Sequence, residues 1–185
     1  MMNNEEKNTP DTNVMVQSAA NYGLWFGLYL MCLFLVFANG GGGAMLSLLG
    51  MIMILCAPLM VLRMLRASYQ RDRQSLNYFR LWNMSVMIFA FASLICALGT
   101  FVWMQFVHPG FIYDKAQEAL ELYRSMPEFQ NSDIVIVLQK AIENGDLPTP
   151  IQFVVEMGWT TVMLGAIVSV PLALLARIGG TKDVE

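Results

Sequence analysis

Residues 81–107 read LWNMSVMIFAFASLICALGTFVWMQFV and contain no charged side chain. Residues 12–62 are equally free of charge, and residues 147–176 contain a single acid, Glu156. A helix needs about 20 apolar residues to cross the hydrocarbon core of a bilayer, and a charge at the centre of that core is costly. These runs therefore predict helices that span a membrane.

The composition of the whole chain indicates the same class of protein. Hydrophobic residues make up 56% of the 185 residues and charged residues 14%, and the mean hydropathy is +0.51. Soluble domains average about 45–50% apolar and about 25% charged residues. Because a chain of this length suits one domain, we expect a single integral membrane domain over residues 1–185.

The predicted fold class is an all-α membrane protein, a bundle of four transmembrane helices. After a flexible tail over residues 1–13, the predicted spans cover residues 17–38, 44–65, 81–107 and 151–176. Cleavage of the first span as a signal peptide after Ala38 is the alternative. A signal peptide should begin with a basic region, whereas Glu5 and Glu6 make this one acidic, so an uncleaved span is favoured.

Charge in the connecting segments predicts the orientation. The turn between the second and third spans is basic, and its arginines are Arg63, Arg66, Arg71, Arg73 and Arg80. Short loops rich in arginine stay on the cytoplasmic side, and the segment over residues 108–150 is acidic, so we expect both termini inside and this segment outside. Orientation alone explains the arginines, although such a patch is also suited to anionic lipid or a cytoplasmic partner.

Two short amphipathic helices are expected in the outer segment, between the third and fourth spans. Apolar residues recur at helical spacing after Asp114, and residues 134–142 follow Ser132, a typical N-cap residue. Residues 134–138 are rich in β-branched side chains, which also favour a strand. A lone strand would have no partner, and the following residues continue a helical pattern, so the helix is favoured.

Cysteine and histidine usage argues against several kinds of chemistry. Cys32, Cys56 and Cys96 all lie in hydrophobic runs, and no two have C-x-x-C spacing. His108 is the single histidine, so no zinc-type cluster can be assembled. No nucleophile, base and orienting group fall together in one segment. We therefore expect no catalytic residue, no metal site, no cofactor and no enzymatic activity.

Two ionisable residues near the membrane are the remaining candidates for a functional site. Glu156 is the one acid in a predicted span, and such a group is a functional candidate because its desolvation must be offset. It lies close enough to the outer end to snorkel or to pair with His108. His108 could sense pH, but its place beside Pro109 suits a helix end. For both residues a structural role is favoured.

Small residues at helical spacing predict how the spans pack. Gly23 and Gly27 form a GxxxG step in the first span, and Gly165 and Ser169 repeat the spacing in the fourth. In lipid, close approach of helix backbones at such faces supplies much of the packing energy. We expect these faces to build the bundle of one chain, with a dimer through Gly23 and Gly27 as the alternative.

Three stretches of sequence resemble one known family. They are residues 20–27 (ANYGLWFG), the turn over residues 69–73 (YQRDR), and Pro109-Gly-Phe ahead of the acidic segment. The chain thereby resembles, from about Gln17 to Ile178, the bacterial four-span membrane family known as domain of unknown function forty-one ninety-nine. The resemblance implies an integral protein of the bacterial envelope and supplies no activity, cofactor or site residue.

Two functions fit these observations. The first is a non-enzymatic accessory or scaffold protein of the bacterial inner membrane, whose partners are membrane lipid and either a second copy or another membrane protein. The alternative is a small oligomeric transporter or channel that uses polar residues of the third and fourth spans. The arginines are not accompanied by any nucleic-acid recognition fold, so no nucleic-acid partner is expected.

Overall fold

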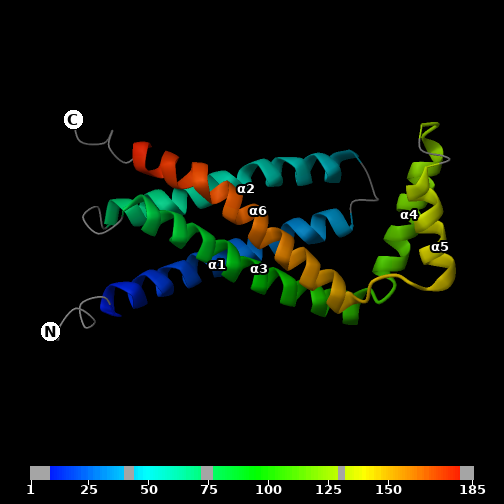
Figure 1. The fold of residues 1–185 in the computed structure, drawn as a ribbon, viewed down its shortest axis with the longest axis horizontal. Helices are drawn as coiled ribbons and strands as arrows, with labels where there is room; N and C mark the ends of the chain where they lie inside the picture. The colour runs from blue at the N-terminus through cyan, green and yellow to red at the C-terminus, as the bar shows by residue number, and fades with distance from the viewer. Residues whose placement is uncertain (1–8, 40–43, 72–76, 129–131, 180–185) are drawn as a thin grey trace. The chain divides into compact units, whose positions relative to one another are not determined.

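The computed structural model describes residues 9–39, 44–71, 77–128 and 132–179, and within these residues it is helical without any strand. The helices are α1 (Thr9–Ala38), α2 (Ala44–Arg71), α3 (Tyr78–Val102), α4 (Phe111–Ser125), α5 (Asp133–Asn144) and α6 (Pro150–Gly179). A π-helical turn, η2 (Trp103–Val107), continues α3. Figure 1 traces their order along the chain.

Four of the helices are long and apolar enough to cross a membrane. Their apolar segments are Met15–Ala38, Met45–Gln70, Tyr78–Val107 and Pro150–Ile178. The sequence predicted four spans at nearly these positions, and the four apolar segments confirm them as candidate membrane helices. α2 contains Pro58 and α6 contains Pro171, and both helices continue through their proline.

α1 begins earlier than the sequence predicts. Its first residue is Thr9, within the segment expected to be a flexible tail. Pro10 explains the early start, because its fixed φ suits the first turn of a helix, where its missing N–H costs no hydrogen bond. Residues 1–8 of the predicted tail lie outside the described residues.

The chain divides into two compact units. The first comprises residues 1–97 and 158–185, and the second comprises residues 98–157. The two units are described separately below.

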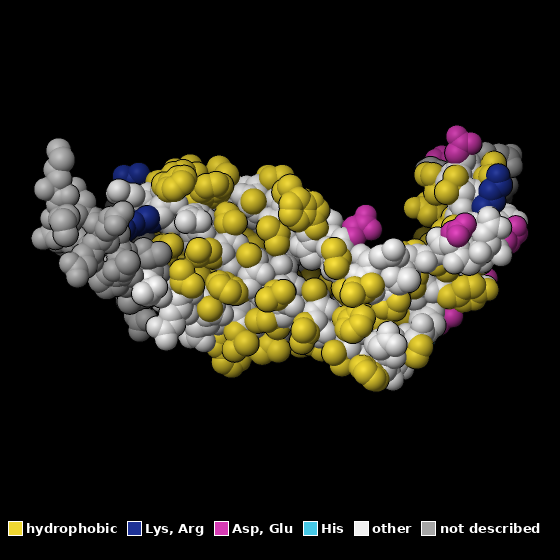
Figure 2. Space-filling model, turned by 60° about the horizontal axis from the view of Figure 1, so that its bottom comes forward, with side chains coloured by type: hydrophobic (Ala, Val, Ile, Leu, Met, Phe, Trp, Pro, Cys, Tyr) yellow, Lys and Arg dark blue, Asp and Glu magenta, His cyan; other side chains and the backbone are white. Residues whose placement is uncertain are grey.

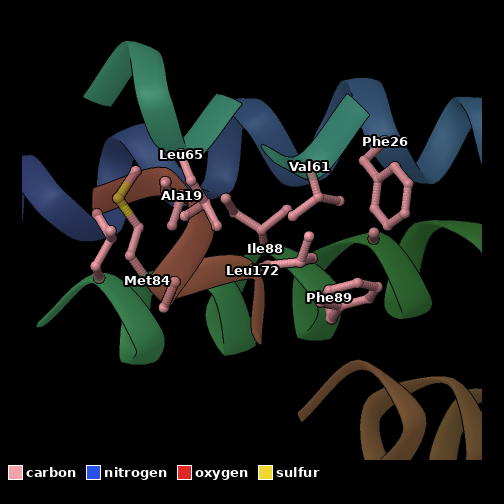
Figure 3. Packing of buried hydrophobic residues seen from close by; sticks show 12 residues of the cluster. Ala19, Phe26, Val61, Leu65, Met84, Ile88, Phe89 and Leu172 are labelled. Atoms are coloured by element: carbon pink, nitrogen blue, oxygen red, sulfur yellow. The ribbon is translucent and has the colours of Figure 1, made fainter. Parts of the chain in front are cut away.

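The first unit has a core to which α1, α2, α3 and α6 all contribute. Figure 3 shows the buried side chains of this core pointing toward one another, Ile88 of α3 among them. The buried set consists of Ala19, Phe26, Val61, Leu65, Leu81, Met84, Ile88, Phe89, Ala92, Leu172, Ala173 and Ala176. Figure 1 shows that two of the helices of this unit begin at the same end, α1 and α3. The other two, α2 and α6, finish at that end. Successive helices are therefore antiparallel.

α1 and α2 also contact each other beyond this core. The Tyr29 hydroxyl donates a hydrogen bond of 2.6 Å to the carbonyl oxygen of Met53. Further along the pair, the ring of Phe37 covers Gly50. Apolar side chains cover much of the outside of the unit (Figure 2), as expected for helices solvated by lipid rather than water.

The second unit contains α4 and α5, which pack against each other. Leu120 of α4 and Val135 of α5 are buried. Arg124 donates a hydrogen bond of 2.7 Å to Gln139, which in turn donates one of 2.7 Å to Glu143. Residues 134–138 are helical rather than extended, because this segment gains a partner helix and no neighbouring strand. α5 ends at Gly145, whose φ of 74° is the left-handed conformation that favours glycine at a helix end.

Candidate functional site

The glycines of α1 lie against α3 of the same chain. A Cβ atom added to Gly23 would come within 2.5 Å of the Phe91 Cβ, and one added to Gly27 would come within 2.9 Å of the Ala92 carbonyl oxygen. Both contacts leave no room for a side chain, so the backbones of α1 and α3 approach as closely as the GxxxG spacing allows. This face is occupied within the chain, so a dimer through it would require α3 to move away.

The α6 residues Gly165 and Ser169 also face α3. Any side chain at Gly165 would overlap the ring of Phe89. The Ser169 hydroxyl is buried, 2.8 Å from the Ser85 hydroxyl and 2.6 Å from the carbonyl oxygen of Gly165. Ser169 has one proton and the carbonyl can only accept, so Ser169 donates to Gly165 and accepts from Ser85. The result is a buried polar contact between two spans.

Two further hydrogen bonds run from α3 to α6. The Trp82 indole donates to the Ala166 carbonyl oxygen at 3.5 Å, and the Tyr78 hydroxyl donates to the Val170 carbonyl oxygen at 3.3 Å. Together with Ser85 they place one polar group on each turn at the start of α3. These three residues were not predicted from the sequence, although polar atoms at every third or fourth residue gave a signal there.

His108 lies in a small aromatic cluster at the end of the π-helical turn. Its ring stacks on Trp103 with centroids 5.7 Å apart, and Phe111 meets Trp103 edge to face at 5.2 Å. The His108 backbone N–H bonds to the Trp103 carbonyl oxygen, which closes the wider turn of the π-helix. The His108 Nδ1 is 3.8 Å from the Asp114 carboxylate. These contacts join the end of the third span to the first turn of α4.

Glu156 is not brought together with His108. Its side chain is exposed, and it forms no hydrogen bond or ion pair with any residue that the structure describes. Nearby, Thr149 and Gln152 cap the start of α6 reciprocally: the Thr149 N–H donates to the Gln152 side chain at 2.9 Å, and the Gln152 N–H donates to the Thr149 hydroxyl at 3.4 Å. Across the described residues, no group of three or more His, Cys, Asp or Glu side chains is placed to hold a metal ion.

The described arginines of the basic turn lie at the end of α2 and the start of α3. Arg63 is exposed, while Arg66 and Arg80 are half-buried. Arg66 has a shielded Nε atom without a hydrogen-bond partner. The Arg71 side chain and all of Arg73 lie outside the described part of the chain.

Comparison with known protein families gives one match. A family model with the description "Protein of unknown function (DUF4199)" matches residues 21–177. The chain belongs to this family. The match begins in α1 and ends in α6, so it includes every helix of this DUF4199 chain, and it confirms the resemblance found in the sequence. No curated protein and no solved structure was found to match the chain.

Proposed function

We propose that this DUF4199 protein is a non-enzymatic accessory or scaffold protein of the bacterial inner membrane that presents its outer segment to a partner protein. The supporting observation is the surface of the α4–α5 pair. Both helices have a packed side, yet Leu122 of α4 and Ile134 and Val137 of α5 remain exposed, Val137 with 65% of its surface. Exposed apolar side chains on a formed surface are typical of interaction sites.

Acidic residues accompany these apolar side chains. Glu118 and Glu121 are exposed on α4, and Asp133 and Glu143 are exposed at the two ends of α5. Anionic headgroups would repel this charge, which favours a protein with a basic and apolar surface over the lipid surface itself. A second copy of the same acidic segment would be repelled as well.

Contacts of the polar residues support a scaffold rather than a transporter. A transport path needs polar groups that are free to meet a substrate. The hydroxyl of Ser93 instead donates to the Ala90 carbonyl oxygen at 2.9 Å, and that of Ser169 donates to Gly165. Glu156 projects from the surface of α6. These hydroxyls stabilise helices, as polar residues commonly do in membranes.

In the proposed orientation both termini and the basic turn are cytoplasmic. Arg63, Arg66, Arg80 and Arg177 supply the described charge at the end of the first unit where α1 and α3 begin. An excess of arginine next to span ends marks the side that stays in the cytoplasm.

Site-specific photo-crosslinking in native membranes tests the proposed partner. A photo-reactive residue at Val137 should give an adduct of one discrete mass, whereas the same residue at Asp146, exposed beyond the end of α5, should not. The substitution Ile134→Asp should abolish the Val137 adduct, because a buried carboxylate in the interface is costly.

Two results would overturn this proposal. One is a Val137 probe that reacts no more than the Asp146 probe. The other is substrate flux in vesicles containing the purified protein that Glu156→Gln abolishes, since this would favour the transporter.

A further inference from the structure

Positive charge gathers at one end of the first unit. Among the side chains that the structure describes there, the charged ones are Arg63, Arg66, Arg80 and Arg177, and none is acidic. The acids of this unit lie outside the described side chains, and they are Glu5, Glu6, Asp11, Asp72, Asp183 and Glu185. Arginine is always protonated, so this end of the unit carries a permanent positive charge.

Arg66 is the arginine that a bound anion would stabilise most. It is half-buried, and its Nε is the one buried side-chain nitrogen or oxygen without a hydrogen-bond partner in the described chain. Shielding a charged group from water without a compensating partner is unfavourable. Because Nε is covered by the protein, an anion must meet the guanidinium at its two terminal nitrogens.

Arg63 lies one turn before Arg66 on α2 and carries the same positive charge. Residues at positions i and i+3 of a helix are neighbours, and like charges at this spacing repel. Arg63 is exposed, and neither arginine forms an ion pair with a described residue. An anion bound between the two side chains would remove the repulsion and neutralise the charge of Arg66 through its two terminal nitrogens.

We infer that Arg66, with Arg63 beside it, binds the phosphate group of an anionic phospholipid at this end of the bundle. The two arginines lie at the end of an apolar segment that runs from Met45 to Gln70, which is the depth of the lipid headgroups. A planar guanidinium matches two phosphate oxygens, and a lipid phosphate is already concentrated at this depth. The site does not depend on the proposed scaffold role.

Native mass spectrometry of the whole protein, purified in detergent and titrated with phosphatidylglycerol or phosphatidylcholine of the same chain length, tests the site. The wild-type protein should retain phosphatidylglycerol in preference. Arg66→Gln should weaken that binding about tenfold, since a charge-assisted hydrogen bond is lost. Arg66→Lys should weaken it similarly, because an ammonium keeps the charge but loses the planar fork.

Arg177→Gln is the matched control. It removes an equal charge from the same end of the first unit, but from an exposed position on α6, and should leave the lipid affinity within about threefold of wild type. Equal losses of phosphatidylglycerol affinity in Arg66→Gln and Arg177→Gln would overturn the proposal, because the lipid would then be held by general electrostatic attraction to this end of the unit. Wild-type affinity in Arg66→Lys would overturn it too, and this variant decides the matter if Arg66→Gln does not fold.

A competition experiment separates a lipid phosphate from a free one. Inorganic phosphate in large excess should leave the bound phosphatidylglycerol in place, because it lacks the acyl chains that hold a lipid at the end of α2. Displacement of the lipid by inorganic phosphate would contradict the assignment to a lipid headgroup.

Discussion

At the scale of single residues, the glycines of the spans are not equivalent. Gly165 of α6 lies against the ring of Phe89, which is itself held edge to face by Phe26 with centroids 5.3 Å apart. Gly158, two turns earlier on the same helix, has only the Ala97 Cβ near it, at 3.9 Å from an added Cβ. The two positions share a helix and a residue type and differ in the space around them.

This difference predicts opposite effects of alanine. Gly165→Ala forces the buried Phe89 ring to move, and we expect it to be less stable than Gly158→Ala by about 1–3 kcal/mol, the usual cost of overpacking. Gly158→Ala should be neutral or should gain up to about 1 kcal/mol of helix propensity. Thermal unfolding of both variants in detergent measures the difference. Equal stability of the two would show that the Phe89 contact is not formed.

The paired hydroxyls of Ser85 and Ser169 give a second prediction at this scale. Hydrogen bonds between spans average about 0.6 kcal/mol and reach about 1.7 kcal/mol. A double-mutant cycle of Ser85→Ala and Ser169→Ala should therefore give a coupling energy in this range. As a control, the pair Ser93→Ala and Ser169→Ala should show additive losses, because Ser93 bonds within its own helix.

At the scale of elements, α5 depends on how it ends. Its C-cap residue Gly145 has a φ of 74°, and an added Cβ would meet no atom within 4 Å. Backbone strain is therefore the one cost of a side chain there. Gly110, which precedes α4, has a φ of −88° that any residue adopts.

Alanine at Gly145 and at Gly110 should distinguish the cost of backbone strain from the cost of steric crowding. Gly145→Ala should destabilise the last turn of α5 by about 1 kcal/mol, because only glycine adopts the left-handed conformation freely. Gly110→Ala should have no comparable effect on α4. Hydrogen exchange of the amides in α4 and α5 measures both. Unchanged exchange at the end of α5 in Gly145→Ala would contradict the left-handed cap.

At the scale of the whole molecule, the proposed orientation predicts which residues each compartment reaches. In a variant without Cys32, Cys56 and Cys96, a cysteine at Asn144 in the outer segment should react with an impermeant maleimide added to spheroplasts. A cysteine at Ala67, exposed beside Arg66, should react only after the membrane is opened. Labelling in the reverse order would invert the orientation.

The four apolar spans could be predicted from the sequence alone, because the cost of charge in hydrocarbon leaves a pattern visible in any single chain. It also predicted helices after Asp114 and Ser132, where water on one side and protein on the other make apolar residues periodic. It identified Gly23, Gly27, Gly165 and Ser169 as packing positions, since small residues are the means of close approach in lipid.

The surfaces that these residues contact became visible in the folded chain. Inside a span, the residues facing lipid and those facing the core are equally apolar, so periodicity does not distinguish them. That is why the contact of α3 with Gly23 and Gly27 and the partnership of Ser85 with Ser169 were not visible in the sequence. The unpartnered Nε of Arg66 depends likewise on what surrounds it, and surroundings are a property of the fold.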